Sequence, residues 1–272
     1  MNKCVQFPGF KLKALTLSYD DGVPHDKRLI SIMQKYGLKG TFNLNSGWFG
    51  QNGRMTKEEV LEVYPSSGME VAIHGHRHLS LAEVNEELAV DDVLTDRKEL
   101  EKLFGCVIKG MAYANGSFND KVVDILKKSG VNYSRTVITT EKFDLPTDWL
   151  RLPTTCHHGN PRLMELAKEF VEKEEHWYYW NNQLQLFYLW GHSYEFDDNN
   201  NWDLIENFAQ YVGGREDIWY ATNGEIYEYL QAGERLQFSA DGSFVRNPSC
   251  IDVFINYLGK KSVIPAGETL KI

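Results

Sequence analysis

Two separate segments hold residue types that can bind a metal ion. His74 and His78 are four residues apart, so one turn of helix or a tight loop can direct both imidazoles at one point. Upstream, an alternating apolar stretch that begins at Leu15 ends at the adjacent carboxylates Asp20 and Asp21. Two imidazoles and one carboxylate suit a borderline divalent ion such as zinc and leave positions for water. The spare carboxylate can then take a proton from that water.

A simpler alternative exists for each segment. Clustered histidines are often only solvated, and an aspartate pair at the end of a strand can cap the next helix. Since both segments follow probable strands, we favour one shared metal site over these two separate explanations.

The two segments also resemble the signatures of a known family. Residues 18–22, Ser-Tyr-Asp-Asp-Gly, are similar to the Thr-Phe-Asp-Asp-Gly signature of the polysaccharide deacetylase family, the carbohydrate esterases that remove N- or O-acetyl groups. Residues 70–81 resemble that family's second signature, a glutamate-led strand followed by His-x-x-x-His. The resemblance implies that Asp20 is the catalytic base. From the ligand types we expect the ion to be Zn²⁺, with Co²⁺, Ni²⁺ or Mn²⁺ as alternatives. The resemblance also implies that the metal ligands are Asp21, His74 and His78.

The third family signature is only partly present. Residues 111–119 align with its usual Arg-x-Pro-Tyr-Gly, but Ala112 stands at the arginine and Asn115 at the tyrosine. In the family a backbone N–H at the tyrosine position helps to bind the tetrahedral oxyanion, and a backbone donor survives a change of side chain, so Asn115 can keep this role. Tyr113, in the same segment, is expected to bind substrate or to support the site. The arginine orients the catalytic aspartate in relatives, so its loss calls for a substitute.

Further histidines follow strands in the second half of the chain. His192 matches the family's last signature, in which a histidine protonates the leaving group, and an imidazole pKa near neutrality suits that step. Trp190 is expected to form a wall of the acetyl pocket, with a place in the core as the alternative. Side chains of adjacent residues in an extended chain diverge, so we do not expect His157 and His158 to bind one metal. We expect one of them, assigned as His158, to line the substrate pocket and the other to pack, with two structural histidines as the alternative.

Arg135 is predicted to replace the missing arginine. Arg77 lies inside the histidine loop and is expected to point away from the ligands, while Arg151 begins a strand at the opposite end of the sheet. Arg135 lies in the middle of a strand, where a buried charge is costly unless it is paired. We therefore predict that Arg135 points inward and reaches Asp20, with an outward position between helices as the alternative.

The composition narrows the class of protein. A chain of 272 residues with 42% hydrophobic residues can bury one large core. A formal charge of −9 argues against a nucleic-acid surface, and no apolar run reaches the ~18 residues that span a membrane. The four cysteines include no CxxC pair, which is typical of reduced thiols. No signal peptide is visible after Met1, so we expect a cytoplasmic protein, although a trimmed chain would look the same.

Strands and helices alternate along most of the chain. Strands are expected at residues 15–19, 40–45, 70–73, 110–114, 133–137, 150–155, 184–190 and 218–221. Helices are expected at residues 26–36, 56–63, 81–104, 119–128, 203–212 and 223–231, with another that starts at residue 160. We expect Asp26 to cap the first helix and the many charged residues of the helix at 81–104 to form a solvated face.

This alternation indicates a mostly parallel sheet with covered faces, either closed as a barrel or doubly wound. Every polar cluster described above follows a strand, which is where the active sites of such folds lie. The family resemblance implies a distorted seven-stranded (β/α) barrel, which we assign to residues 1–232. Short strands after this point predict a small C-terminal β appendage, residues 233–272, packed on the barrel.

The resemblance implies a metal-dependent hydrolase that removes acetyl groups from an acetylated (amino) sugar or oligosaccharide through metal-activated water. The missing signal peptide favours one alternative, a hydrolase of another non-peptide C–N bond in a small cytoplasmic molecule. The missing arginine favours another, a non-catalytic sugar-binding relative, although a pure binder has no use for a base at Asp20. The expected partners are an acetylated carbohydrate or a small amide substrate, with no nucleic acid and no membrane span.

Overall fold

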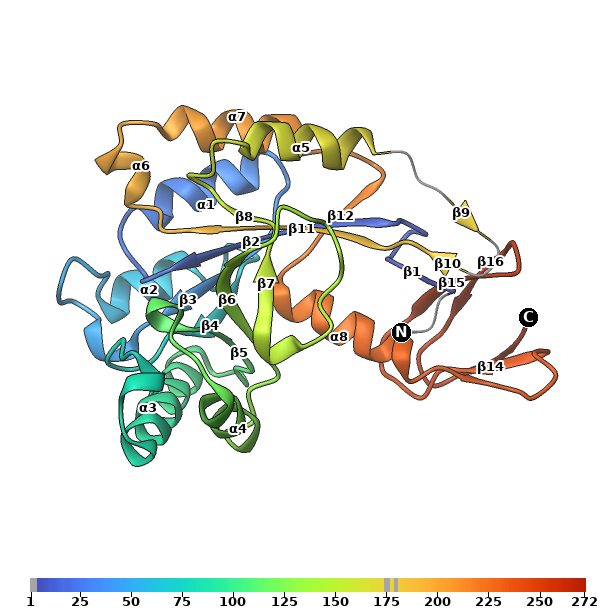
Figure 1. Cartoon of the computed structure of the whole chain (residues 1–272), viewed down its shortest axis with the longest axis horizontal. Helices are drawn as coiled ribbons and strands as arrows, with labels where there is room; N and C mark the ends of the chain where they lie inside the picture. Colours follow the sequence, from blue (N-terminus) through green and yellow to red (C-terminus); the bar gives the residue numbers. More distant parts are fainter. Residues whose placement is uncertain (1–3, 174–176, 179–180) are drawn as a thin grey trace.

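The centre of the fold is a parallel sheet that curves into a nearly closed barrel (Figure 1). The computed structural model describes residues 4–173, 177–178 and 181–272. In the order in which they are hydrogen-bonded, the strands are β7 (Leu152–Thr154), β6 (Tyr133–Thr139), β5 (Gly110–Ala112), β4 (Glu70–Ile73), β3 (Gly40–Leu44), β2 (Lys13–Asp20), β11 (Gln185–Gly191) and β8 (Cys156–His157). A further parallel strand, β12 (Ile218–Tyr220), pairs with the first half of β2.

The two ends of this sheet belong to one stretch of chain. Only Thr155 separates β7 from β8; β7 pairs with β6 and β8 pairs with β11. The Thr155 N–H donates to the carbonyl of Tyr188 on β11 at 2.9 Å, so this stretch bridges the two edges of the sheet. With β7 and β8 counted as one interrupted strand, the eight strands in the hydrogen-bonded order reduce to seven among the described residues. The predicted distorted seven-stranded (β/α) barrel is confirmed.

Helices cover both sides of the barrel because each presents an apolar face. Helix α4 (Asp120–Lys128), for example, buries Val122, Val123, Ile125 and Leu126. The helices α1 (Asp26–Lys35), α5 (Leu163–Glu172) and α7 (Trp202–Val212) lie on one side, and α3 (Glu86–Phe104), α4 and α8 (Asn223–Glu234) lie on the other (Figure 1). Shorter elements follow individual strands: α2 (Lys57–Val63), α6 (Glu195–Asp198), η1 (Ser46–Trp48), η2 (Leu81–Glu83), η3 (Ala114–Gly116) and η4 (Trp149–Arg151).

Two predictions about helices are wrong. The helix expected at residues 81–104 is broken after η2, because the Asn85 side chain accepts the Leu88 N–H and starts α3 only at residue 86. Glu86, Glu87, Asp91, Lys98 and Lys102 on α3 are exposed, as expected for a solvated face, whereas Asp92 and Asp96 are fully buried.

Asp26 does not cap α1 either, because the residue at the N-cap position is His25. The Asp26 carboxylate is instead buried, where it accepts hydrogen bonds from Ser193 and Tyr64.

Two small antiparallel sheets lie beside α8 at one end of the barrel (Figure 1). One contains β1 (Val5–Gln6), β15 (Val253–Tyr257) and β16 (Lys260–Ile264), and the other contains β13 (Gln237–Phe238), β14 (Phe244–Arg246) and β17 (Thr269–Lys271). Strands β9 (Trp177–Tyr178) and β10 (Asn181–Asn182) pair with each other. Helix α8 runs through the boundary predicted at residue 233, and β1 joins the appendage from the N-terminal end, so the division into two units stays a prediction. Within the described residues, no helix has the length and apolarity needed to cross a membrane.

Candidate metal and acid–base site

The predicted ligands lie where the chain leaves its strands in an unusual backbone conformation. Asp21 follows β2 with φ 85°, His78 follows β4 with φ 54°, and Asn115 follows β5 with φ 56°. A positive φ costs a non-glycine residue roughly 1–2 kcal/mol, and such residues cluster at functional sites. Three residues predicted for the site therefore share a strained conformation that aims their groups at one end of the barrel.

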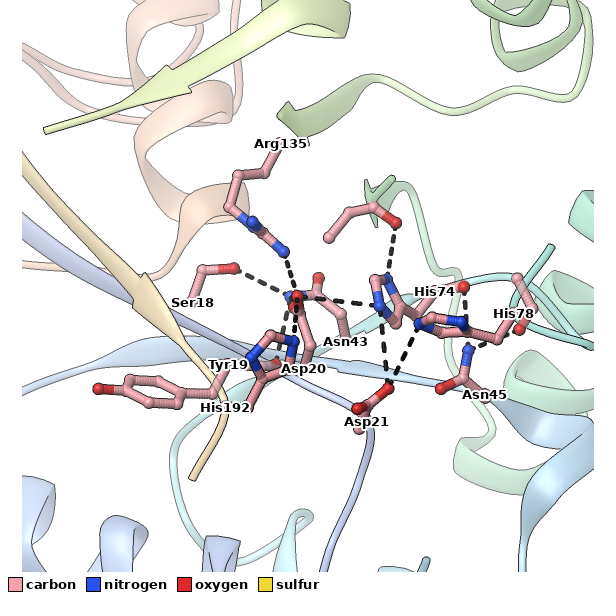
Figure 2. Close-up of polar contacts among 12 residues, drawn as sticks. Ser18, Tyr19, Asp20, Asp21, Asn43, Asn45, His74, His78, Arg135 and His192 are labelled. Carbon is pink, nitrogen blue, oxygen red and sulfur yellow. Dashed lines mark hydrogen bonds and ion pairs between the residues drawn. The ribbon is translucent and has the colours of Figure 1, made fainter. Parts of the chain in front are cut away.

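Asp21, His74 and His78 form a compact cluster of potential ligand atoms (Figure 2). Asp21 Oδ1 lies 3.6 Å from His78 Nε2 and 4.0 Å from His74 Nε2. One potential ligand atom from each residue lies within 4.8 Å of the others. Two imidazoles and a carboxylate at this spacing make a site of the kind that holds a divalent ion.

Hydrogen bonding fixes the tautomer of His74. Its Nδ1 lies 2.8 Å from the carbonyl oxygen of Ala112, which can only accept, so Nδ1 carries the proton. The lone pair of Nε2 is then directed at the cluster, as metal ligation requires. Burial lowers the pKa of His78, and the neighbouring His74 lowers it further, which favours the neutral imidazole that can bind a metal.

Asp21 carries the clearest sign that the cluster is built for a cation. Its Oδ1 is buried without a hydrogen-bond partner among the described residues, which is costly for a carboxylate oxygen. Its Oδ2 is paired with Arg54 at 3.0 Å. The arginine therefore occupies one oxygen and leaves the other to face both histidines, so the residues present fit a divalent metal ion.

Asp20 is held beside the cluster by donors from other strands (Figure 2). Asn43 on β3 donates to Oδ1 at 2.8 Å, and the guanidinium of Arg135 on β6 donates to Oδ2. The predicted contact between Arg135 and Asp20 is thus present, and both side chains are almost completely buried. Burial alone would raise the pKa of Asp20, but Arg135, with help from His74 and His192, outweighs it and lowers the pKa to about 2.

His192 approaches Asp20 from the end of β11. Its Nε2 lies 3.9 Å from Asp20 Oδ2, and its Nδ1 lies 2.8 Å from Glu195 Oε1. Burial lowers the pKa of His192, but the hydrogen bond to Glu195 and the charge of Asp20 outweigh it, so the pKa is raised above its ordinary value. The structure therefore brings together the predicted base, the predicted acid and the three predicted ligands.

The other residues predicted for the site have partners outside the ligand triad. The Tyr113 side chain is buried and its hydroxyl donates to Leu150 O at 2.7 Å. The Asn115 side chain donates to Ser80. Trp190 is half-buried, and the Arg135 guanidinium lies 4.4 Å from its ring centroid, so the indole face covers the arginine that holds Asp20.

Two buried acids that the sequence reasoning missed support the histidine loop from α3. Asp96 accepts the backbone N–H groups of His74 and Ser46, and Asp92 accepts that of Arg77. They are four residues apart on the inner face of α3, beside buried Ala89 and Val93, and this spacing is the signal that could have revealed them. The Arg77 side chain points away from the ligands, as predicted, and pairs with Asp91 and Asp92.

The expectation that His157 and His158 diverge is wrong. Their Nε2 atoms lie 3.3 Å and 2.9 Å from the same oxygen of Glu195, because the chain leaves β8 between them. Glu195 was also missed by the sequence reasoning. Its position three residues after His192 was the available signal, since residues at this spacing face each other when the segment is helical.

Comparison with known proteins agrees with the resemblance. Residues 9–134 match the family model described as polysaccharide deacetylase, so the resemblance predicted from the sequence is confirmed. The uncharacterised Bacillus subtilis protein YlxY is 21% identical over 171 residues, which are 62% of this chain and 52% of YlxY. The chain spans about half the length of the curated relatives it matches.

Solved structures share the fold. A Mycobacterium smegmatis protein provisionally assigned to the polysaccharide deacetylases has a TM-score of 0.61 at 16% identity, and the match covers 85% of this chain and 94% of that one. A family 4 carbohydrate esterase from Streptomyces lividans, in complex with acetate, has a TM-score of 0.53 at 15% identity, with 78% and 93% covered. At these identities the likeness establishes the barrel fold.

Proposed function

Because residues 9–134 match the polysaccharide deacetylase family, we propose that this chain is a metal-dependent hydrolase that removes acetyl groups from an acetylated sugar or oligosaccharide. One observation carries the proposal. The carboxylate of Asp20 lies between Arg135 and His192, and His74 Nε2, a proposed ligand atom, is 3.8 Å from it. The proposed base Asp20 and the proposed acid His192 thus lie close to the three candidate metal ligands, which we call the metal cluster.

Asp20 is proposed to accept a proton from the attacking water. Arg135 keeps its carboxylate ionised, and Arg135 and Asn43 together hold both oxygens of Asp20 in place. Arg135 in this way takes over from the next strand the orienting contact that Ala112 cannot make.

His192 is proposed to hold the proton that goes to the leaving nitrogen or oxygen. The backbone N–H of Asn115 is proposed to donate to the oxyanion that forms at the acetyl carbonyl. An ion held by Asp21, His74 and His78, most simply Zn²⁺, would supply Lewis acidity that polarises the carbonyl and acidifies water. Trp190 is proposed to shield this region from water.

The substrate class is tested by comparing acetylated chito-oligosaccharides with simple acetamides, using zinc-loaded protein and released acetate as the readout. We expect acetate from the oligosaccharides and little from the amides, with Asp20→Asn as the inactive control. Faster release from simple amides would favour the alternative of a small-molecule C–N hydrolase. Saturable oligosaccharide binding without any acetate release would identify a non-catalytic binder.

A further inference from the structure

Glu195 lies at the centre of three imidazoles that come from two different strands. The Nδ1 of His192, after β11, lies 2.8 Å from Oε1. The Nε2 atoms of His157 and His158, from β8 and the residue after it, lie 3.3 Å and 2.9 Å from Oε2. This arrangement has the composition of a second metal site, since one atom each of His157, His158 and Glu195 lies within 4.8 Å of the others.

Hydrogen bonding at the far side of His157 argues against a metal there. The backbone N–H of Gly159 donates to His157 Nδ1 at 3.0 Å, so this nitrogen has a lone pair and no proton. A neutral imidazole then carries its proton on Nε2, which is the atom that faces Glu195. His157 is therefore a hydrogen-bond donor to the carboxylate and has no lone pair to offer a metal at that position.

His158 is a donor for a related reason. Its side chain is only 3% exposed, and its Nδ1 is buried without a partner among the described residues. A proton on that nitrogen would be buried and unpaired, which is costlier than an unpaired lone pair, so the proton belongs on Nε2. The ring stacks against Phe196 at 4.2 Å and Tyr19 at 5.8 Å between centroids, which fixes its direction toward Glu195.

We propose that Glu195 is the positioning residue for His192, and that His157 and His158 are the two fixed donors that hold Glu195 in place. Three N–H groups then converge on one carboxylate, which stays ionised. Burial raises the pKa of Glu195, but the hydrogen bonds from the three histidines outweigh it, so the net pKa is lowered. This inference rests on the proposed function, because it gives His192 the acid's role.

The arrangement sets both the tautomer and the direction of the acid. Because Glu195 accepts from Nδ1, the other nitrogen of His192 is the one that faces Asp20 and the reacting atoms. An imidazolium there is stabilised by the Glu195 charge. Among the described residues, the groups that face His192 from the elements around it are Asp20, Asp21, His157, His158, Trp190, Tyr194 and Glu195.

This assignment changes the expected role of His158. It was predicted to line the substrate pocket, whereas its buried ring and its bond to Glu195 place it behind the acid. His157 is more exposed, but its Nε2 points at the same carboxylate. Both histidines therefore act through Glu195 and have no need to touch substrate.

The test is an NMR titration of the imidazoles in zinc-loaded protein, with His192 assigned by loss of its signals in His192→Gln. In Glu195→Gln we expect the pKa of His192 to fall by about one to three units, since a neutral amide cannot stabilise the imidazolium. The kcat on an acetylated oligosaccharide should fall about tenfold to hundredfold with little change in KM. The matched control is Asp198→Asn, an exposed carboxylate on the same helix, which should leave both values unchanged.

An unchanged His192 pKa in a folded Glu195→Gln variant would overturn the proposal. The ¹⁵N shifts of the wild type give a second test that needs no variant: His157 and His158 should both be protonated on Nε2. An unprotonated His157 Nε2, together with a second bound zinc equivalent, would show a metal site and overturn it too. If the His192 pKa falls as expected but the wild type releases no acetate, the deacetylase proposal fails and the positioning role of Glu195 stands.

Discussion

The metal cluster and the Glu195 cluster contain the same kinds of residue but differ in where their protons lie. Asp21 with His74 and His78 lies at the ends of β2 and β4, and Glu195 with His157 and His158 lies at the ends of β8 and β11. In each cluster a carboxylate oxygen lies between two imidazole nitrogens. Composition and spacing alone would assign a metal to both.

The difference comes from the partner on the far side of each imidazole. A carbonyl oxygen, of Ala112, faces His74 Nδ1 and leaves a lone pair at Nε2. A backbone N–H, of Gly159, faces His157 Nδ1 and leaves a proton at Nε2. The carboxylates differ in the same sense, since Asp21 Oδ1 has no hydrogen-bond partner among the described residues, whereas Glu195 accepts from its histidines. The backbone group that bonds the far nitrogen of His74 or of His157 thus decides whether the near nitrogen can ligate a metal or must donate a proton.

The largest expected effect is the loss of bound zinc when a ligand of the metal cluster, but not a histidine of the Glu195 cluster, is replaced. His78→Ala leaves two of the three proposed ligands and should abolish stoichiometric zinc binding, whereas His157→Ala should retain it. Elemental analysis of dialysed protein measures both variants in one experiment. Unchanged zinc in His78→Ala would show that the metal cluster has been assigned wrongly.

The next largest effect is expected on kcat when Asp20, the carboxylate beside the metal cluster, is replaced. Asp20→Asn should lower kcat by about 10²–10⁴-fold, because an amide cannot accept the proton, while zinc content stays unchanged. Acetate release and elemental analysis check the two halves of this prediction. Loss of zinc in Asp20→Asn would mean that the roles of Asp20 and Asp21 are exchanged.

A smaller effect is expected when His192, the proposed acid that Glu195 positions, is replaced. His192→Ala should lower kcat on an acetylated sugar by about a hundredfold, and by much less on an aryl acetate, whose leaving group needs no proton. Steady-state rates on the two substrates give the ratio. Equal losses on both would point to a structural role for this histidine.

The ion pair between Arg135 and Asp20 is expected to contribute to the free energy of unfolding. Arg135→Met leaves a buried carboxylate unpaired and should lower the free energy of unfolding by about 3–5 kcal/mol. Adding Asp20→Asn should recover part of this loss, because the uncompensated charge is then removed. Denaturant unfolding of the single and double variants measures both values, and a single variant as stable as the wild type would contradict the pairing.

The effect that is smallest per unit of pH concerns Asp26, another buried acid, which contrasts with Glu195. Among the described residues, Asp26 has the Ser193 and Tyr64 hydroxyls as its side-chain donors, and burial raises its pKa to about 7 despite them. The unfolded chain then releases this proton near pH 4 and the folded chain near pH 7, so Asp26 makes stability fall as pH rises through this window. The slope is up to about 1.4 kcal/mol per pH unit.

Asp26→Asn should remove that contribution, because an amide does not titrate. Unfolding free energies of the wild type and of this variant, measured from pH 4 to pH 7, give the difference in slope. Parallel curves would show that Asp26 is ionised throughout this range.

The metal cluster could be predicted because its information is local. The end of β2 supplies the aspartates, and the loop after β4, a strand whose predicted bounds agree with the structure, supplies both histidines within five residues. The inward position of Arg135 could be predicted because a charge in mid-strand must find a partner.

Glu195 could not be predicted in the same way, because no sequence motif links it to His157 and His158. His157 meets it only through the pairing of β8 with β11, and no periodicity encodes that register. The start of α3 was missed for a different reason, since the Asn85 cap outweighed the apolar pattern around Leu81. The burial of Asp92 could not be predicted, because a charged side chain alone indicates a solvated position.

The pairing of β11 with β2 in the barrel has a consequence for the order of folding. His192 comes beside Asp20 only after β11 has paired with β2, and this pairing joins residues from opposite ends of the chain, such as Leu17 and Leu189. Contacts of this kind carry a loop-closure cost and form late. The metal cluster depends on the earlier neighbours β2, β3 and β4 and can assemble before this pairing is complete. During refolding, zinc uptake should therefore precede the recovery of turnover, and the interval between them is the time that this pairing takes to form.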